Sequence, residues 1–233
     1  MAKNNPGFKE KAGSRSQTDA AAHRYLAPTF TRSPLRRAEF QILNPAHLIP
    51  FLQQVDYVVL GMVTPSGTPY QTQVNAVWHE GALCFHSSPG GAKMKLLQAG
   101  SPVHAVATLA LSLLPSDFFH PQQACGATQF FLSLHLEGQA WPVDEASAKC
   151  EILNALMQRF QPQGNYQPLA PGEQYDKDLA KTAVIKVVPH SMVGKFKLGQ
   201  NLSPAARADL MRQLEQRGTP VDLLTLQWMK AFS

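Results

Sequence analysis

One stretch of the chain, residues 70–97, constrains the fold most because it predicts several changes of structure in a short span. Its sequence is YQTQVNAVWHEGALCFHSSPGGAKMKLL. Side chains alternate in character from Gln71 to Ala76 with the period of two that is typical of a strand. Residues 79–81, His-Glu-Gly, predict a tight turn, and residues 82–85 resume the strand. The stretch therefore predicts a β-hairpin that leads through a glycine-containing loop into a short helix.

The loop after this hairpin has the chemistry of a phosphate site. It brings together His86, Ser87, Ser88 and Lys93 around two consecutive glycines. Hydroxyl groups, accessible backbone N–H groups and a lysine favour an anion, and the start of a helix adds partial positive charge. The same residues are also typical of an ordinary strand-to-helix connection, so the sequence alone leaves both interpretations open.

Composition limits the class of protein. The 233 residues are 44% hydrophobic and 16% charged, which is ordinary for one large or two small globular domains. No apolar run approaches the roughly 20 residues of a membrane span, and the N-terminus lacks the apolar segment of a secretory signal. Cys84, Cys125 and Cys150 are too widely spaced to predict a disulfide framework or a zinc motif. We therefore expect a cytoplasmic protein without membrane contact, and the histidine spacing predicts no metal site.

The positive charge is concentrated at one end of the chain. Residues 1–37 hold eight of the 21 Lys and Arg residues but two of the 16 Asp and Glu residues. Residues 1–32 are also poor in apolar runs, so they predict a disordered basic extension before a single domain over residues 33–233. A basic tail can contact nucleic acid but is more often solvated, and no helix-turn-helix with a basic recognition helix follows. Nucleic acid is therefore not an expected partner.

The rest of the chain predicts mainly strands with helices between them. Further strands are expected at residues 57–63, 103–113, 128–141 and 182–188, with helices from Pro45, over 146–160 and over 205–216, and a short C-terminal helix. About six strands, mostly antiparallel, favour an α+β fold built on a closed or split β-barrel. Gly138 predicts a bulge, Asn44 and Asp144 predict helix N-caps, and residues 114–126 form a long loop that suits a flap.

Three segments in this order resemble the FMN-binding split-barrel proteins. GTPYQTQVNAVWHEGALCFHSSPGGAKMKLLQAGSPV resembles the pyridoxamine 5′-phosphate oxidase-like proteins and the 5-nitroimidazole reductase group. LEGQAWPVDEASAKCEILNALMQRFQPQGNY is similar to the strand and helix of that group, and GKFKLGQNLS resembles the C-terminal signature of Pai-type flavin-binding regulators. The resemblance covers roughly residues 33–220. It implies a split-barrel homodimer with FMN at the subunit interface.

The resemblance also implies roles for particular residues. Those expected along the flavin ring are Thr72, Gln73, Val74 and Asn75. Those expected at the ribityl chain and phosphate are His86, Ser87, Ser88 and Lys93. Those expected from the partner chain are Lys195, Lys197, Gln200 and Asn201. His86 is also a candidate for proton transfer, because the ordinary histidine pKa lies near neutrality, although a histidine hydrogen-bonded at a strand end is an equal alternative.

The sequence departs from the oxidases at the phosphate-binding positions. The oxidases have an arginine at the position of Thr72 and an Arg-Lys pair at Ala92-Lys93, so fewer charges remain here. There is also no counterpart of the oxidase's C-terminal substrate segment, so pyridoxamine 5′-phosphate oxidation is not expected. We expect an FMN-dependent oxidoreductase that passes electrons from NADH or NADPH to a small acceptor. The alternatives are a non-catalytic flavin-binding regulator and a haem-binding split barrel with His190 or His86 as axial ligand.

Overall fold

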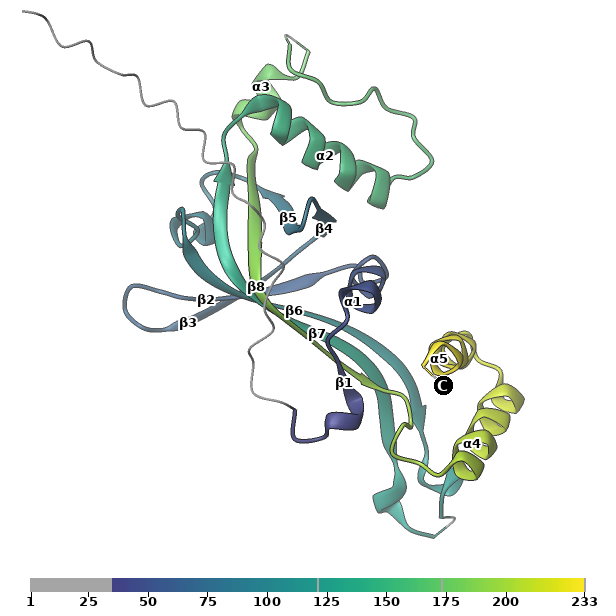
Figure 1. The fold of residues 1–233 in the computed structure, drawn as a ribbon. Coiled ribbons are helices and arrows are strands. Elements are labelled where there is room, and N and C mark those ends of the chain that lie inside the picture. The colour runs from purple at the N-terminus through teal and green to yellow at the C-terminus, as the bar shows by residue number, and fades with distance from the viewer. Residues whose placement is uncertain (1–34, 121, 173, 233) are drawn as a thin grey trace, which may run out of the picture.

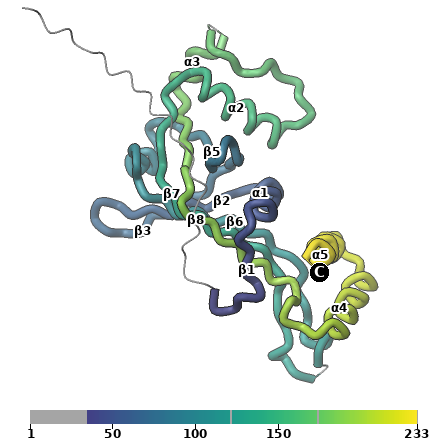
Figure 2. Tube along the Cα trace, viewed as in Figure 1, coloured from purple at the N-terminus to yellow at the C-terminus, as the bar shows by residue number. Residues whose placement is uncertain are grey.

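A computed structural model describes residues 35–120, 122–172 and 174–232, and its centre is one antiparallel sheet of eight strands (Figures 1 and 2). The strands are β1 (Gln41–Ile42), β2 (Val58–Val63), β3 (Pro69–Val74), β4 (Ala76–His79), β5 (Ala82–Ser87), β6 (Ser101–Leu114), β7 (Thr128–Val143) and β8 (Ala183–Lys197). The order across the sheet is β3-β2-β6-β7-β8-β5-β4, and β1 pairs with β8. The predicted α+β fold is confirmed, with more strands than the six expected. The predicted extension over residues 1–32 lies outside the described residues.

The sheet closes on itself at Asn75. β3 and β4 lie at opposite ends of the strand order, yet only Asn75 separates them in the chain. The chain therefore crosses from one edge of the sheet to the other at this residue, which makes a split barrel. The single strand expected through Ala76 is thus two strands. The Asn75 side-chain amide donates a hydrogen bond to the backbone carbonyl of Asp56 at 2.8 Å and so holds the crossing point.

Arg159, from α2 (Ala146–Phe160), holds the same region. Its guanidinium donates to the backbone carbonyls of Ala76, at the start of β4, and of Leu52 and Val55, at and beyond the end of the first helix. Burial lowers the pKa of Arg159, and these carbonyls replace part of the water that the charged group loses. One side chain thus joins a helix, a strand and the connection between them.

The long strands β6, β7 and β8 carry the main core. Their inward residues alternate along each strand and are almost fully buried, among them Ala105, Leu132, Leu134 and Phe196. The register between β7 and β8 shifts at Gly138, so that His190 is an extra residue on β8. The predicted bulge at Gly138 is confirmed, and β8 continues through it to Lys197, beyond the expected end at residue 188.

Helices cover both ends of these strands. They are α1 (Pro45–Leu52), α2 (Ala146–Phe160), α3 (Asp176–Ala180), α4 (Pro204–Arg217) and α5 (Pro220–Ala231), with short 3₁₀ helices η1 (Ala38–Phe40), η2 (Ala92–Lys95), η3 (Ser116–Phe118) and η4 (Ala124–Gly126). Figure 1 shows α2 and α3 at one end of the sheet and α4 and α5 at the other. None of the helices in the described ranges has the length and apolar character that a membrane span requires.

The helix starts confirm one predicted cap and correct another. The Asn44 side chain accepts from the N–H of Ala46 and caps α1, as predicted. The cap of α2 is Glu145 instead of Asp144, because the Glu145 carboxylate accepts from the N–H groups of Ser147 and Ala148. The short helix expected after the glycine-containing loop is only the 3₁₀ turn η2, since the chain turns again soon after Leu97.

A buried carboxylate anchors α5 to the end of β6. Asp222 is fully buried and accepts hydrogen bonds from Ser112 Oγ at 2.6 Å, Thr219 Oγ1 at 2.6 Å and Arg217 Nε at 2.8 Å. Thr225 Oγ1 lies 2.8 Å from Ser112 Oγ and completes the group. These bonds tie the C-terminal helices to the sheet.

We expect Gly138→Ala to lower the free energy of unfolding by about 2 kcal/mol, because overpacking a closed site forces the backbone to move. A Cβ at Gly138 would lie 2.4 Å from the carbonyl oxygen of Val188. Gly90→Ala is the matched control, since a Cβ there has no atom within 4 Å. Urea denaturation of both variants measures the difference, and equal stability would contradict the tight fit at the bulge.

We expect Asp222→Asn to lower the free energy of unfolding by about 2–3 kcal/mol, because hydrogen bonds to a charged group are lost. The control is Asp209→Asn, whose ion pair with Arg212 is exposed and contributes little. Chemical denaturation at pH 7 makes the comparison.

The same carboxylate predicts a pH dependence. The hydrogen bond from Arg217, aided by those from Ser112 and Thr219, lowers the pKa of Asp222 in the folded protein. Its contribution to stability is therefore complete above the ordinary aspartate pKa of about 4 and is lost as the pH falls below that value. The wild-type Tm should drop more steeply below pH 4 than the Tm of Asp222→Asn, and parallel curves would contradict this assignment.

Candidate functional site

The hairpin of β4 and β5 brings the first group of expected site residues together. Ala76 pairs with Phe85, so Asn75 and His86 are the next residues at the same end of this hairpin. His86 and Ser87 in turn pair with the first residues of β8. The register therefore places the end of β3, the end of β5 and the loop that follows them at one location.

The electrostatics of this location involve His86 and Lys93. His86 is exposed, and its pKa is lowered by partial desolvation and, to a smaller extent, by the positive charge of Lys93. The lowered pKa favours the neutral imidazole, which is able to accept a proton. Ser87 Oγ donates to the carbonyl of Ser88 at 3.3 Å within the loop. The sequence predicted that the start of a helix would add positive charge to this loop. Because η2 spans only four residues, the positive charge here comes from Lys93 and not from a helix dipole.

The end of β3 offers backbone groups. Thr72 pairs with Leu60 and Gln73 with Val59, both on β2. β3 is the last strand in the sheet order, so among the described residues its other side has no strand partner. Val74 is buried, whereas Gln73 and Asn75 are exposed. This edge is able to exchange hydrogen bonds with a flat polar ring.

The second group of expected residues lies elsewhere in the chain. Lys195, Lys197 and Asn201 line a cavity of about 600 Å³ beyond the far end of β8. Ser87 pairs with Ala183, and Lys195 lies twelve residues further along the strand, a path of about 40 Å at the usual rise. The fold therefore does not bring the two groups together within one chain.

The cavity is strongly cationic. Its other basic side chains are Arg36 and Arg37, and the described residues that line it include no carboxylate, although Arg37 also pairs with Glu39 at 3.6 Å. Burial and the charges of Lys195 and Arg37 lower the pKa of Lys197, whose ammonium contacts Thr128 Oγ1. Lys195 Nζ lies 5.4 Å from the centre of the Phe131 ring. Cations beside an aromatic surface suit an anionic ligand with a flat apolar part.

One residue and one loop that the sequence singled out also lie near this end of β8. The Gln200 side chain accepts from the N–H of Leu198 at 2.8 Å and donates to the carbonyl of Phe196 at 2.7 Å, so it stabilises its own turn. The loop over residues 114–126, expected as a flap, borders the cavity through Phe119, His120 and Cys125.

Several residues at these sites gave no local signal in the sequence. Arg36 and Arg37 line the cavity. In the sequence they were counted only among the many basic residues of the N-terminal segment, so nothing marked them as site residues. No metal site was expected, yet the fold brings the possible ligands His79, Glu80 and Glu151 close together. Glu151 belongs to α2 and the other two to the hairpin, so their sequence spacing carried no signal.

A groove of about 580 Å³ lies at the bulge on the outer side of the sheet. Its lining is mostly apolar and includes Met62, Val63 and Tyr70. His190, the extra residue of the bulge, and His104 also line it. His104 Nε2 lies 3.3 Å from His135 Nδ1 on the neighbouring strand.

A single antiparallel sheet whose edge strands are continuous through Asn75 defines the split β-barrel class. Residues 45–196, more than half of the chain, match the family described as pyridoxamine 5′-phosphate oxidase. The chain therefore belongs to the pyridoxamine 5′-phosphate oxidase-like family. No curated protein matches the sequence.

Solved structures share this fold at low sequence identity. The FAD and heme binding protein of Mycobacterium smegmatis is 18% identical with a TM-score of 0.58, over 68% of this chain and 73% of that one. The flavocytochrome Anf3 of Azotobacter vinelandii is 19% identical with a TM-score of 0.59, over 70% and 72%. A putative 5-nitroimidazole antibiotic resistance protein of Bacteroides thetaiotaomicron is 21% identical with a TM-score of 0.54, over 66% and 85%.

We expect Lys93→Ala to raise the pKa of His86, because the variant removes a positive charge that opposes protonation of the imidazole. Lys95→Ala, two residues further on at an exposed position, is the control. Titration of the histidine ring protons by NMR measures both. An unchanged His86 pKa in Lys93→Ala would mean that the two side chains do not form one site.

Proposed function

We propose that this chain binds FMN as a homodimer and passes electrons from NADH or NADPH to a small electron-poor acceptor. The observation that carries the proposal is the register of the β4–β5 hairpin, which groups Asn75, His86 and the loop of Lys93 at the free edge of β3. Hydrogen-bonding groups for a ring and a cation for a phosphate lie next to each other there.

The residues present fit the cofactor. The side-chain N–H of Asn75 already donates to Asp56, so its carbonyl oxygen and the β3 backbone remain for the polar edge of the flavin ring. Lys93 supplies the charge for the phosphate, with the hydroxyls of Ser87 and Ser88 nearby in the sequence. When bound, FMN supplies the redox chemistry by accepting a hydride and passing electrons on. The neutral imidazole of His86 is then placed to accept or return a proton.

The separation of the two basic regions supports a dimer. Lys195 lies about 40 Å along β8 from the hairpin end, by the strand rise, and Lys197 and Asn201 follow it in the chain. They reach a site at the hairpin only if a second copy of the chain supplies them, which is the arrangement that the family resemblance implies. The structural neighbours named for FAD and heme, and for nitroimidazole resistance, agree with a redox cofactor and an electron-poor acceptor.

Absorption spectroscopy tests the cofactor. We expect added FMN to remain with the protein through desalting, and Lys93→Ala to raise its Kd about tenfold, as for a lost charge-assisted hydrogen bond. Lys95→Ala is the control and should bind as the wild type does. FAD in a parallel titration distinguishes the two flavins. A protein that retains neither would contradict the proposal.

The reductant is tested on the loaded protein. Under anaerobic conditions, NADH or NADPH should bleach the flavin bands within seconds, and a nitroaromatic acceptor should restore them. Retained FMN that neither nucleotide reduces would leave a non-catalytic flavin protein and would contradict the oxidoreductase assignment.

Haem is the second candidate, because the mostly apolar groove at the bulge carries an exposed histidine. His190 is exposed at the rim of this groove and is free of the sheet pairing on either side. In the same spectra, haem bound through His190 would give a Soret band that His190→Ala shifts and His120→Ala does not. No Soret band at saturating haem would remove this candidate.

A further inference from the structure

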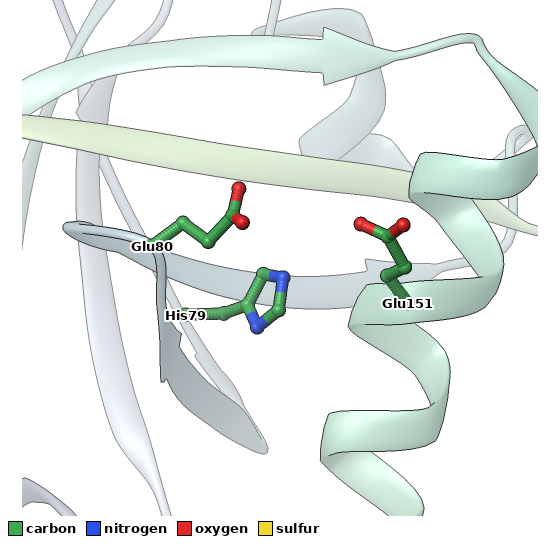
Figure 3. A group of neighbouring side chains, drawn as sticks. All are labelled: His79, Glu80 and Glu151. Carbon is green, nitrogen blue, oxygen red and sulfur yellow. The ribbon is translucent and has the colours of Figure 1, made fainter.

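His79, Glu80 and Glu151 converge at the turn end of the β4–β5 hairpin, opposite the end that carries Asn75 and His86 (Figure 3). One ligand atom from each side chain lies within 4.8 Å of those of the other two. We propose that these three side chains bind a divalent transition-metal ion of the zinc type. The proposal is independent of the flavin proposal, since the two groups share no residue.

The fold fixes the positions from which the three side chains extend. His79 pairs with Ala82 across the turn, and Glu80 is the first residue of that turn. Glu151 comes from α2, whose next residue, Ile152, is buried against the hairpin in a separate apolar cluster that also contains Val77. Packing therefore holds the helix and the turn at a constant separation, which is the condition for a preformed site.

The side chains themselves are available to a ligand. No hydrogen bond or ion pair involves any of the three within the part of the chain that the structure describes. They border a hollow of about 70 Å³, which is large enough for a hydrated ion. Two carboxylates that face each other at this distance repel, and a divalent cation between them would turn that repulsion into attraction.

Lys186 is the alternative source of positive charge. It lines the same hollow, and the described residues include no ion pair between it and either carboxylate. A single flexible ammonium neutralises one carboxylate at most and leaves the imidazole without a role. The three convergent donors thus fit a metal ion better than a lysine.

The donor set selects the class of metal. One imidazole nitrogen and two carboxylate oxygens suit Zn²⁺, Co²⁺ or Mn²⁺, whereas Mg²⁺ and Ca²⁺ prefer oxygen alone. Cys84 also lines the hollow, but its side chain is almost fully buried and it is not among the donors that converge. Bonds of about 2.0–2.2 Å require the ligand atoms to approach to about 3.4 Å, which rotation of the two exposed glutamates permits. Water would complete the coordination.

Metal titration of the full-length protein, free of affinity tags and treated with a chelator, tests the proposal. We expect one Zn²⁺ per chain by calorimetry and a rise in Tm on adding Zn²⁺. Glu151→Gln and His79→Gln should each weaken binding at least tenfold and abolish the rise in Tm. Glu215→Gln, an exposed glutamate on α4, is the matched control and should behave as the wild type does.

Further measurements distinguish metal binding at this site from nonspecific binding to other histidines on the surface. Co²⁺ should give a visible absorption spectrum that both ligand variants lose. Lys186→Gln removes a competing cation and should strengthen Zn²⁺ binding. Circular dichroism checks that each variant is folded, and Glu80→Gln replaces any variant that is not. Zn²⁺ binding that persists unchanged in the ligand variants would overturn the proposal, as would equally tight binding of Mg²⁺.

Discussion

The structure depends on the crossing of the chain at Asn75. A sheet of this size has two edges, and here the same stretch of chain supplies both of them, β3 on one side of Asn75 and β4 on the other. The crossing is held by the bond from Asn75 to Asp56 and by the guanidinium of Arg159. Because Arg159 also binds two carbonyls at the end of α1, the crossing, α1 and α2 are positioned by one set of hydrogen bonds.

That crossing also determines where chemistry is possible. It brings the end of β3 beside the end of β5, and this juxtaposition groups Asn75 with His86 and the loop of Lys93. The long strand β8 then carries a second basic region to the far end of the same subunit. This division of the polar groups is the basis of our proposal that a second copy of the chain completes the site.

Much of the fold followed from local sequence patterns. Three predictions that depended only on residues adjacent in the chain are confirmed. They are the hairpin turn at Glu80, the bulge at Gly138 and the helix that begins at a proline and is capped by Asn44. The division of the strand at Asn75 was missed because side chains alternate without interruption through that residue. The cap of α2 was assigned one residue early, since Asp144 and Glu145 are both capable of the role and only the geometry separates them. Sites built from distant elements, such as Glu151 beside His79, depend on helix packing and have no local signal.

The edge strand β3 has a further consequence for the behaviour of the protein at high concentration. Unpaired strands are templates on which a second chain adds, and such growth ends in fibres. β3 begins with Pro69, which has no N–H to offer, and its exposed positions Gln71 and Gln73 are polar. The start of this edge therefore lacks one of the donors that an added strand would use, while the backbone groups further along it stay accessible to a small molecule.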